Sequence, residues 1–212
     1  MKNLRQSNRF QYAVLLIVSV LFAASVHGQS KKTRPAGKSA NQTTALKEQT
    51  SFSSEGKILS SVELPLDILR QLAEYDGGEL AKCQQDEFTR QSNAAKHFAA
   101  SKVNLDGDRQ LDLIVQAQTP CFMGAHNTTF WIFTKRDKNA VPNYQLTFDI
   151  AVDFLKILKT SVNGYRDIET ASHTAVELST IIWKFDGRKY QRSECRLTNL
   201  TTNKVAKIKC NL

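Results

Sequence analysis

The sequence predicts an α+β fold that is mostly β, an antiparallel β-meander with one short N-terminal helix packed on it. Three observations lead to this prediction. Residues 64–75 have a helical pattern of apolar positions, and after residue 78 the chain alternates between strand-like and turn-like segments. Asn163-Gly164 and Asp186-Gly187 are strong signals for two-residue hairpins. No segment alternates strands with long helices, as a parallel sheet requires.

The predicted helix, residues 64–75 (LPLDILRQLAEY), has a start signal and a stop signal. Pro65 suits the first turn, where its missing N–H breaks no helical hydrogen bond, and Gly77-Gly78 end the pattern. One face of this helix is apolar, and we expect it to cover a sheet. The residues of that face are Ile68, Leu69 and Leu72.

The strand predictions follow from β-branched and aromatic runs with turn signals between them. Residues 97–103 and 111–117 flank an acidic segment, and residues 128–134 (TTFWIFT) are rich in aromatic side chains. Between residues 145 and 152 apolar and polar residues alternate, which indicates one buried and one solvated face. About seven strands, joined mostly by short turns, predict the meander.

The N-terminus has the pattern of a signal peptide. A positively charged start precedes an uncharged apolar run at residues 13–24, and small residues follow up to Gly28. The run is shorter than the roughly 20 residues of a membrane span, so we expect residues 1–28 to be cleaved after Gly28. The alternative is an uncleaved signal anchor. The positive charges at the start are Lys2, Arg5 and Arg9.

The remaining chain divides into a polar linker and one domain. Residues 29–57 are basic and contain few large apolar residues, so we expect a disordered linker, with an electrostatic tether as the alternative. Residues 58–212 are long enough for a single β-rich domain with its own core. The chain carries a net charge of +9, but most of the excess precedes this domain, which argues against a nucleic-acid partner.

Four cysteines lie in the domain and none in the linker. An even number of cysteines in an exported chain predicts two disulfides. We favour Cys83–Cys121 and Cys195–Cys210, because each bridge closes within its own half of the domain, and the other two pairings stay open. The predicted location is therefore periplasmic or extracellular.

The segment NLDGDRQLDLIV, residues 104–115, has the ligand spacing of a calcium loop. Oxygen-bearing side chains fall at alternate positions, as a shell of oxygen ligands requires. A neutral Asn at position one and Arg109 at the usual glycine position argue against calcium. The alternative is a polar turn whose side chains accept hydrogen bonds from backbone N–H groups. The candidate metal ligands are Asn104, Asp106, Asp108, Gln110 and Asp112.

This segment resembles the D-x-D-G-D-x-x-x-D hairpin of FG-GAP and VCBS-type repeats of secreted bacterial proteins. The resemblance carries ligand roles onto Asn104, Asp106, Asp108 and Asp112, and Arg109 departs from the pattern. The segments NGYRDIE (163–169) and WKFDGRKY (183–190) are similar to motifs of small exported bacterial proteins. These similarities imply a fold and an exported location rather than a known activity.

Motifs for common catalytic chemistry are absent from the sequence. It contains no G-x-S-x-G, no H-E-x-x-H and no phosphate-binding glycine loop, and its histidines do not have metal-ligand spacing. We therefore assign no catalytic residue. The loop at residues 119–127 is the candidate recognition surface, with a disulfide-pinned structural loop as the alternative. Its recognition residues would be Phe122, Met123 and His126.

These observations together favour an exported, non-catalytic binding or interaction module. We expect it to be monomeric, without a transmembrane span after signal cleavage, and to bind an unknown envelope or extracellular partner. The sequence does not decide whether the acidic loop is a weak calcium site. Two other functions also stay open: a glycan or cell-wall hydrolase whose carboxylates meet only in the fold, and a secreted inhibitor of a foreign enzyme.

Overall fold

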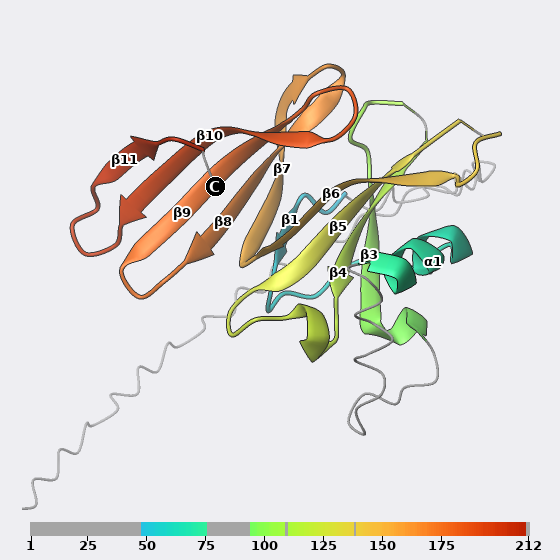
Figure 1. Ribbon diagram of the computed structural model, residues 1–212, viewed down its shortest axis with the longest axis horizontal. Coiled ribbons are helices and arrows are strands. Elements are labelled where there is room, and N and C mark those ends of the chain that lie inside the picture. Colours follow the sequence, from blue (N-terminus) through green and yellow to red (C-terminus); the bar gives the residue numbers. More distant parts are fainter. Residues whose placement is uncertain (1–47, 76–93, 109, 138, 211–212) are drawn as a thin grey trace, which may run out of the picture. The chain divides into compact units, whose positions relative to one another are not determined.

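The computed structural model describes residues 48–75, 94–108, 110–137 and 139–210. The described residues belong to one compact unit. They form two antiparallel sheets and one short α-helix, which confirms the predicted α+β, mostly β fold (Figure 1). The predicted signal peptide, residues 1–28, lies outside the described residues.

The two sheets, here called sheet A and sheet B, contain only antiparallel pairs among the described strands. In spatial order, sheet A consists of β1 (Ser51–Ser53), β7 (Phe154–Val162), β8 (Tyr165–His173), β9 (Glu177–Phe185), β10 (Tyr190–Asn199) and β11 (Val205–Ile208). Sheet B consists of β2 (Ser61–Val62), β3 (Phe98–Val103), β4 (Asp112–Ala117), β5 (Thr128–Lys135) and β6 (Tyr144–Val152). Two short 3-10 helices, η2 (Ala94–His97) and η3 (Pro120–Phe122), precede β3 and follow β4.

Sheet B is the middle layer of the fold because both of its faces are covered. On β5, Phe130 and Ile132 point into a core shared with sheet A, and both are fully buried. The intervening residues Trp131 and Phe133 point into a second core under the helix, and they are also fully buried. A strand covered on both faces reads as a continuous apolar run, which explains the sequence TTFWIFT.

The helix α1 (Leu66–Glu74) covers the outer face of sheet B. Pro65 is its N-cap residue, one position earlier than the predicted first turn. Ile68 and Leu72 are buried and Leu69 packs against the same core, so the predicted apolar face is confirmed. The predicted stop signal at residues 77–78 lies outside the described residues.

A hairpin turn is present at each predicted place, but the second is shifted by one residue: Asp186 N donates to Lys189 O, so Gly187 and Arg188 are its central residues. Asn163 and Gly164 have positive φ angles of 53° and 83°, and they connect β7 to β8. Positive φ at both central residues gives the backbone twist that a two-residue hairpin needs. Gly187, with φ 103°, lies in the turn between β9 and β10.

The folded part begins earlier than the sequence predicted. Residues 29–57 were expected to be a disordered linker, but β1 pairs with β7 within this range, and Phe52 is 4% exposed. The Phe52 ring lies 6.5 Å from that of Phe130, between the sheets. The segment is polar on average, and Phe52, a buried residue in its described part, gives no periodic apolar pattern by which a strand could be predicted. Residues 29–47 lie outside the described residues.

A disulfide joins Cys195 on β10 to Cys210 beyond β11, the pair favoured from the sequence. Cys121 is also disulfide-bonded, and Cys83, its predicted partner, lies outside the described residues. No helix in the described part of the chain is both long enough and apolar enough to span a membrane.

Replacing Phe52 tests whether the first strand belongs to the fold. Phe52→Ala should lower the free energy of unfolding by about 3 kcal/mol, because it leaves a cavity between the two sheets. Urea unfolding measures this change. The neighbouring exposed residue Ser51 is the control, since Ser51→Ala should change stability by less than about 0.5 kcal/mol. Equal stability of the two variants would mean that residues 51–53 do not pack on the domain and belong to the linker.

Candidate functional site

The acidic segment forms the turn between β3 and β4, and its side chains accept hydrogen bonds from its own backbone. Asn104 Oδ1 accepts from Gly107 N at 2.6 Å, and Asp106 Oδ1 accepts from Asp108 N at 3.0 Å. Asp108 Oδ1 accepts from Gln110 N at 2.6 Å. Asn and Asp side chains commonly stabilise turns in this way. Gly107 has φ 80°, a left-handed conformation that glycine adopts without strain.

Asp112 differs from the other carboxylates because it is buried, with 1% of its surface exposed. Its two oxygens accept hydrogen bonds from Leu105 N at 3.0 Å and Lys135 N at 2.9 Å. Burial raises the pKa of Asp112 from 3.8 to about 6, although these two hydrogen bonds oppose the shift. Asp112 therefore holds the acidic turn against the end of β5.

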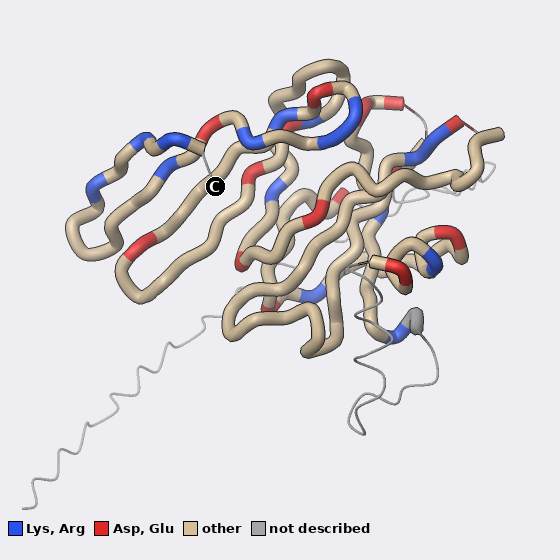
Figure 2. The backbone as a smooth tube through the Cα atoms, in the orientation of Figure 1, with Lys and Arg blue, Asp and Glu red and all other residues tan. Residues whose placement is uncertain are grey.

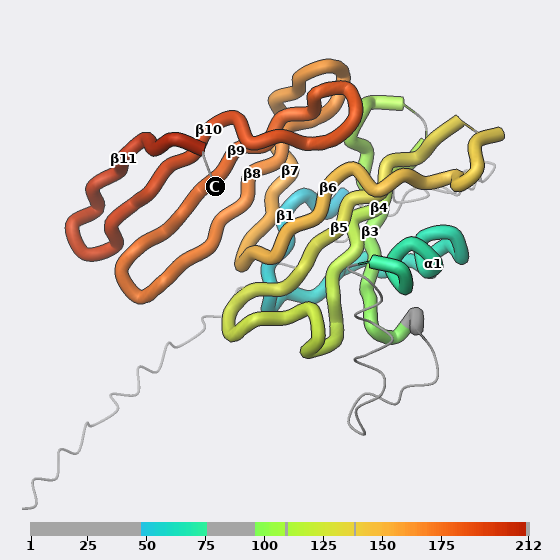
Figure 3. Tube along the Cα trace, viewed as in Figure 1, coloured from blue at the N-terminus to red at the C-terminus, as the bar shows by residue number. Residues whose placement is uncertain are grey.

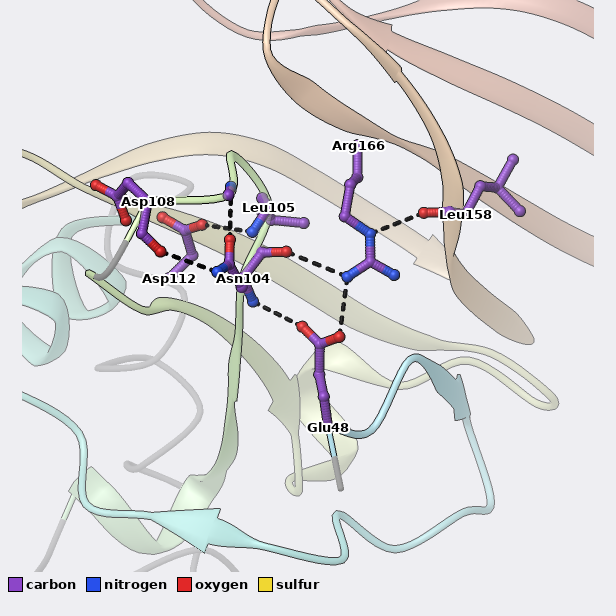
Figure 4. Close-up of polar contacts among 8 residues, drawn as sticks. Glu48, Asn104, Leu105, Asp108, Asp112, Leu158 and Arg166 are labelled. Atoms are coloured by element: carbon purple, nitrogen blue, oxygen red, sulfur yellow. Dashed lines mark hydrogen bonds and ion pairs between the residues drawn. The ribbon is translucent and has the colours of Figure 1, made fainter. Parts of the chain in front are cut away.

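An ion pair from outside the turn holds its first residue (Figure 4). Glu48 Oε1 accepts from Asn104 N at 2.7 Å, and Glu48 Oε2 pairs with Arg166 Nη1 at 2.9 Å. Arg166 also donates to the carbonyl oxygens of Asn104 and Leu158, at 3.1 and 2.8 Å. Its backbone N–H donates to Leu105 O at 2.7 Å. Arg166 thereby connects β8 of sheet A to the turn of sheet B.

The predicted calcium ligands are brought together in one turn, but Asn104, Asp106, Asp108 and Asp112 already act as hydrogen-bond acceptors there. Asp112 uses both oxygens, and Asp106 accepts from the backbone of Asp108. Burial, and after it the nearby carboxylates Asp106 and Asp112, raise the pKa of Tyr165 to about 12. Gln110 donates its backbone N–H to Asp108 Oδ1. Arg109 lies outside the described residues. This arrangement supports the polar turn, and calcium binding stays a prediction.

The candidate recognition loop is divided between core and surface. The Phe122 ring packs against Trp131, with ring centres 5.3 Å apart, and against Phe98 at 6.2 Å. Met123 is 40% exposed and His126 is also exposed. Of the three predicted recognition residues, Met123 and His126 are therefore the accessible ones.

A basic groove lies between the ends of β5 and β6 and the β9–β10 turn, and sequence reasoning missed it. Lys135, Arg136 and Arg188 line a cavity of about 430 Å³, together with neutral residues such as Gln145. An adjoining cavity of about 410 Å³ shares Gln145 and Arg188 and adds Lys189. We define the basic groove by its four cations, Lys135, Arg136, Arg188 and Lys189. Figure 2 shows the basic residues of the β9–β10 turn.

The four cations of the basic groove form no ion pair with any residue that the structure describes. Asp186 lines the groove, but its carboxylate accepts hydrogen bonds from the backbone N–H groups of Arg188 and Lys189, at 2.8 and 2.9 Å. These hydrogen bonds lower the pKa of Asp186, and they hold the β9–β10 turn in shape. No single stretch of sequence signals this groove, because its cations come from two turns far apart in the chain.

Comparisons of the chain with protein-family models, with curated proteins and with solved structures gave no match. The resemblance to FG-GAP and VCBS-type repeats therefore stays a prediction.

The raised pKa of Asp112 predicts a specific pH dependence. The folded pKa of about 6 exceeds the ordinary 3.8, so the folded state binds the proton more tightly. The contribution of Asp112 to stability is therefore greatest below about pH 4, falls as the pH rises to about 6, and is constant above that. Because Asp112→Asn cannot ionise, its stability relative to wild type should improve by about 2–3 kcal/mol between about pH 4 and pH 7.

Urea unfolding across this pH range, with a chelator present, measures the difference. Asp186→Asn is the matched control, because the pKa of Asp186 is lowered. Its stability relative to wild type should change little between about pH 4 and pH 7, because Asp186 ionises below this range in the folded protein. A parallel pH dependence of wild type and Asp112→Asn would contradict the burial argument.

Calcium separates the two interpretations of the acidic turn. A site with a Kd of about 10⁻⁴–10⁻³ M would add about 1.4–2.7 kcal/mol of stability in about 10 mM calcium. Asp108→Ala would remove that gain. Because the turn carboxylates already accept backbone hydrogen bonds, we expect the melting curves of wild type in calcium and in chelator to coincide. A gain that Asp108→Ala abolishes would instead establish the metal site.

Proposed function

We propose that the protein is an exported binding module that holds an anionic ligand in the basic groove. The observation that carries this proposal is the set of four cations that line one groove without ion-pair partners among the described residues. Like charges gathered in one place repel each other and create a local positive potential. An anion that enters the groove relieves this repulsion and is attracted by the potential.

The side chains of the groove suit carboxylate or phosphate groups. Arg136 and Arg188 carry planar guanidinium groups, which can donate two parallel hydrogen bonds to either anion. Lys135 is held over the Tyr144 ring, 4.2 Å from its centre. Gln145 is exposed on the shared wall of the two cavities, where it can donate a neutral hydrogen bond. The groove therefore offers charge and directional donors together.

Binding is favoured over hydrolysis by the roles of the nearby carboxylates. A glycosidase needs two carboxyl groups facing a cleft, one as acid and one as base or nucleophile. Asp186, on the groove wall, is occupied by backbone hydrogen bonds, and Asp149, which lines a separate cavity, accepts a hydrogen bond from Tyr75 Oη at 2.7 Å. Export is supported by the Cys195–Cys210 disulfide, because such bonds persist in oxidising compartments.

The groove can be tested with two defined polyanions, inorganic polyphosphate and poly-L-glutamate. The double variant Arg136→Ala/Arg188→Ala should bind at least about tenfold more weakly than wild type to the preferred probe, because two charge-assisted contacts are lost. Fluorescence anisotropy at increasing salt measures the affinity and its salt dependence. The two probes also distinguish a preference for phosphate from one for carboxylate.

The matched control removes the same net charge elsewhere. Lys204→Ala/Lys207→Ala changes two exposed lysines at the β10–β11 hairpin, and it should alter the affinity by less than about twofold. An equal loss in both double variants would mean that the probes respond to overall charge, and the proposed groove would then be wrong.

A further inference from the structure

A second site forms where the chain crosses from sheet B to sheet A (Figure 3). β6 ends at Val152 and β7 begins at Phe154, so Asp153 alone lies between two strands of different sheets. The register of the strands brings two other segments to this crossing. Val152 pairs with Thr128 at the start of β5, and Phe154 pairs with Ala171 near the end of β8.

These two segments each carry a histidine, His126 just before β5 and His173 at the end of β8. The centres of their imidazole rings are 5.7 Å apart. Both residues are exposed at the surface. The two histidines are far apart in the sequence, which is why their spacing along the chain gave no sign of a shared site.

Asp153 fixes the orientation of one of these imidazoles. It is 3% exposed, and its Oδ2 accepts a hydrogen bond from His173 N at 2.7 Å and lies 2.5 Å from His173 Nδ1. A carboxylate at Nδ1 favours the tautomer in which Nδ1 carries the proton, so Nε2 keeps a free lone pair. Histidines that bind metals are commonly held by a carboxylate in this way.

The backbone around His126 is also held in place. Ser54 Oγ donates to the carbonyl oxygen of His126 at 2.7 Å, and Ser54 N donates to Asp153 O at 2.8 Å. Gly124 N donates to Asn127 O at 2.9 Å, which closes the turn that carries His126. Ser54 thus connects the two segments that bear the imidazole of His126 and the orienting carboxylate of Asp153.

We propose that His126 and His173 together bind one divalent transition-metal ion, with Asp153 as the positioning residue. With zinc–nitrogen bonds of about 2.0–2.1 Å and about 1.1 Å from nitrogen to ring centre, two ligating imidazoles have centres at most about 6.4 Å apart. The observed separation of 5.7 Å lies within this limit. Neutral imidazole suits Zn²⁺, Cu²⁺ and Ni²⁺, whereas calcium prefers oxygen ligands.

The site has two protein ligands, and water completes the coordination. Among the described residues, no three or more His, Cys, Asp or Glu side chains are grouped so that they could hold a metal. We therefore expect modest affinity and an open coordination position, as in sites that keep a place for an external ligand. This proposal does not depend on the basic groove or on the acidic turn.

Titration of the tag-free protein with Zn²⁺ alone tests the proposal. Isothermal titration calorimetry at about pH 7.5 should show one ion per chain, and binding should weaken at about pH 5.5 because protonated imidazole cannot bind the metal. His126→Gln and His173→Gln should each weaken binding at least tenfold. Asp153→Asn should weaken it by about 10–100-fold, the usual effect of losing the group that orients a ligand.

A second variant at the same position separates ligation from structure. His126→Asp keeps a metal-binding side chain, so it should bind Zn²⁺ more tightly than His126→Gln, while urea unfolding without metal shows whether each variant is folded. Unchanged Zn²⁺ affinity in both His→Gln variants would place the ion elsewhere and overturn the proposal. Failure of the folded wild type to bind Zn²⁺ at about pH 7.5 would overturn it as well.

Discussion

The burial of both faces of sheet B is the constraint on which the rest of the structure depends. Residues 128–134 on β5 are all buried, since one face packs against sheet A and the other against the helix layer. A strand in this position has no solvated face on which polar chemistry could be placed. Each candidate site described above lies instead at a strand end or turn.

The sequence predicted best what is decided locally. The Asn163-Gly164 turn and the apolar face of α1 depend on residues within a few positions of each other, and both were found where they were predicted. The division into two sheets depends instead on contacts between distant segments. Phe52 pairs with Leu155 across sheet A, and one apolar residue in a polar stretch gives no periodic signal of such a contact.

The distinction between local contacts and contacts of distant segments also applies to the candidate functional sites. The side chains of the acidic turn could be identified from their spacing, but the position of the turn also depends on Glu48 and Arg166, which are 118 residues apart in the chain. The basic groove and the pair formed by His126 and His173 each combine residues from two separate hairpins. The net charge of +9 gives the excess of cationic over anionic side chains, but it does not predict where the fold brings the cationic side chains together.

The Cys195–Cys210 disulfide has a consequence for the edge of sheet A. Within the described residues β11 is an outermost strand, paired only with β10, and all four of its residues are exposed, including Val205 and Ile208. An open strand edge with apolar side chains is a template on which another chain can add a strand. The disulfide anchors this strand at its far end, so β11 is held on β10 and the neighbouring edge of β10 stays covered. In a reducing environment the same hairpin would lose that anchor, and β11 could separate from β10 and expose a longer strand edge.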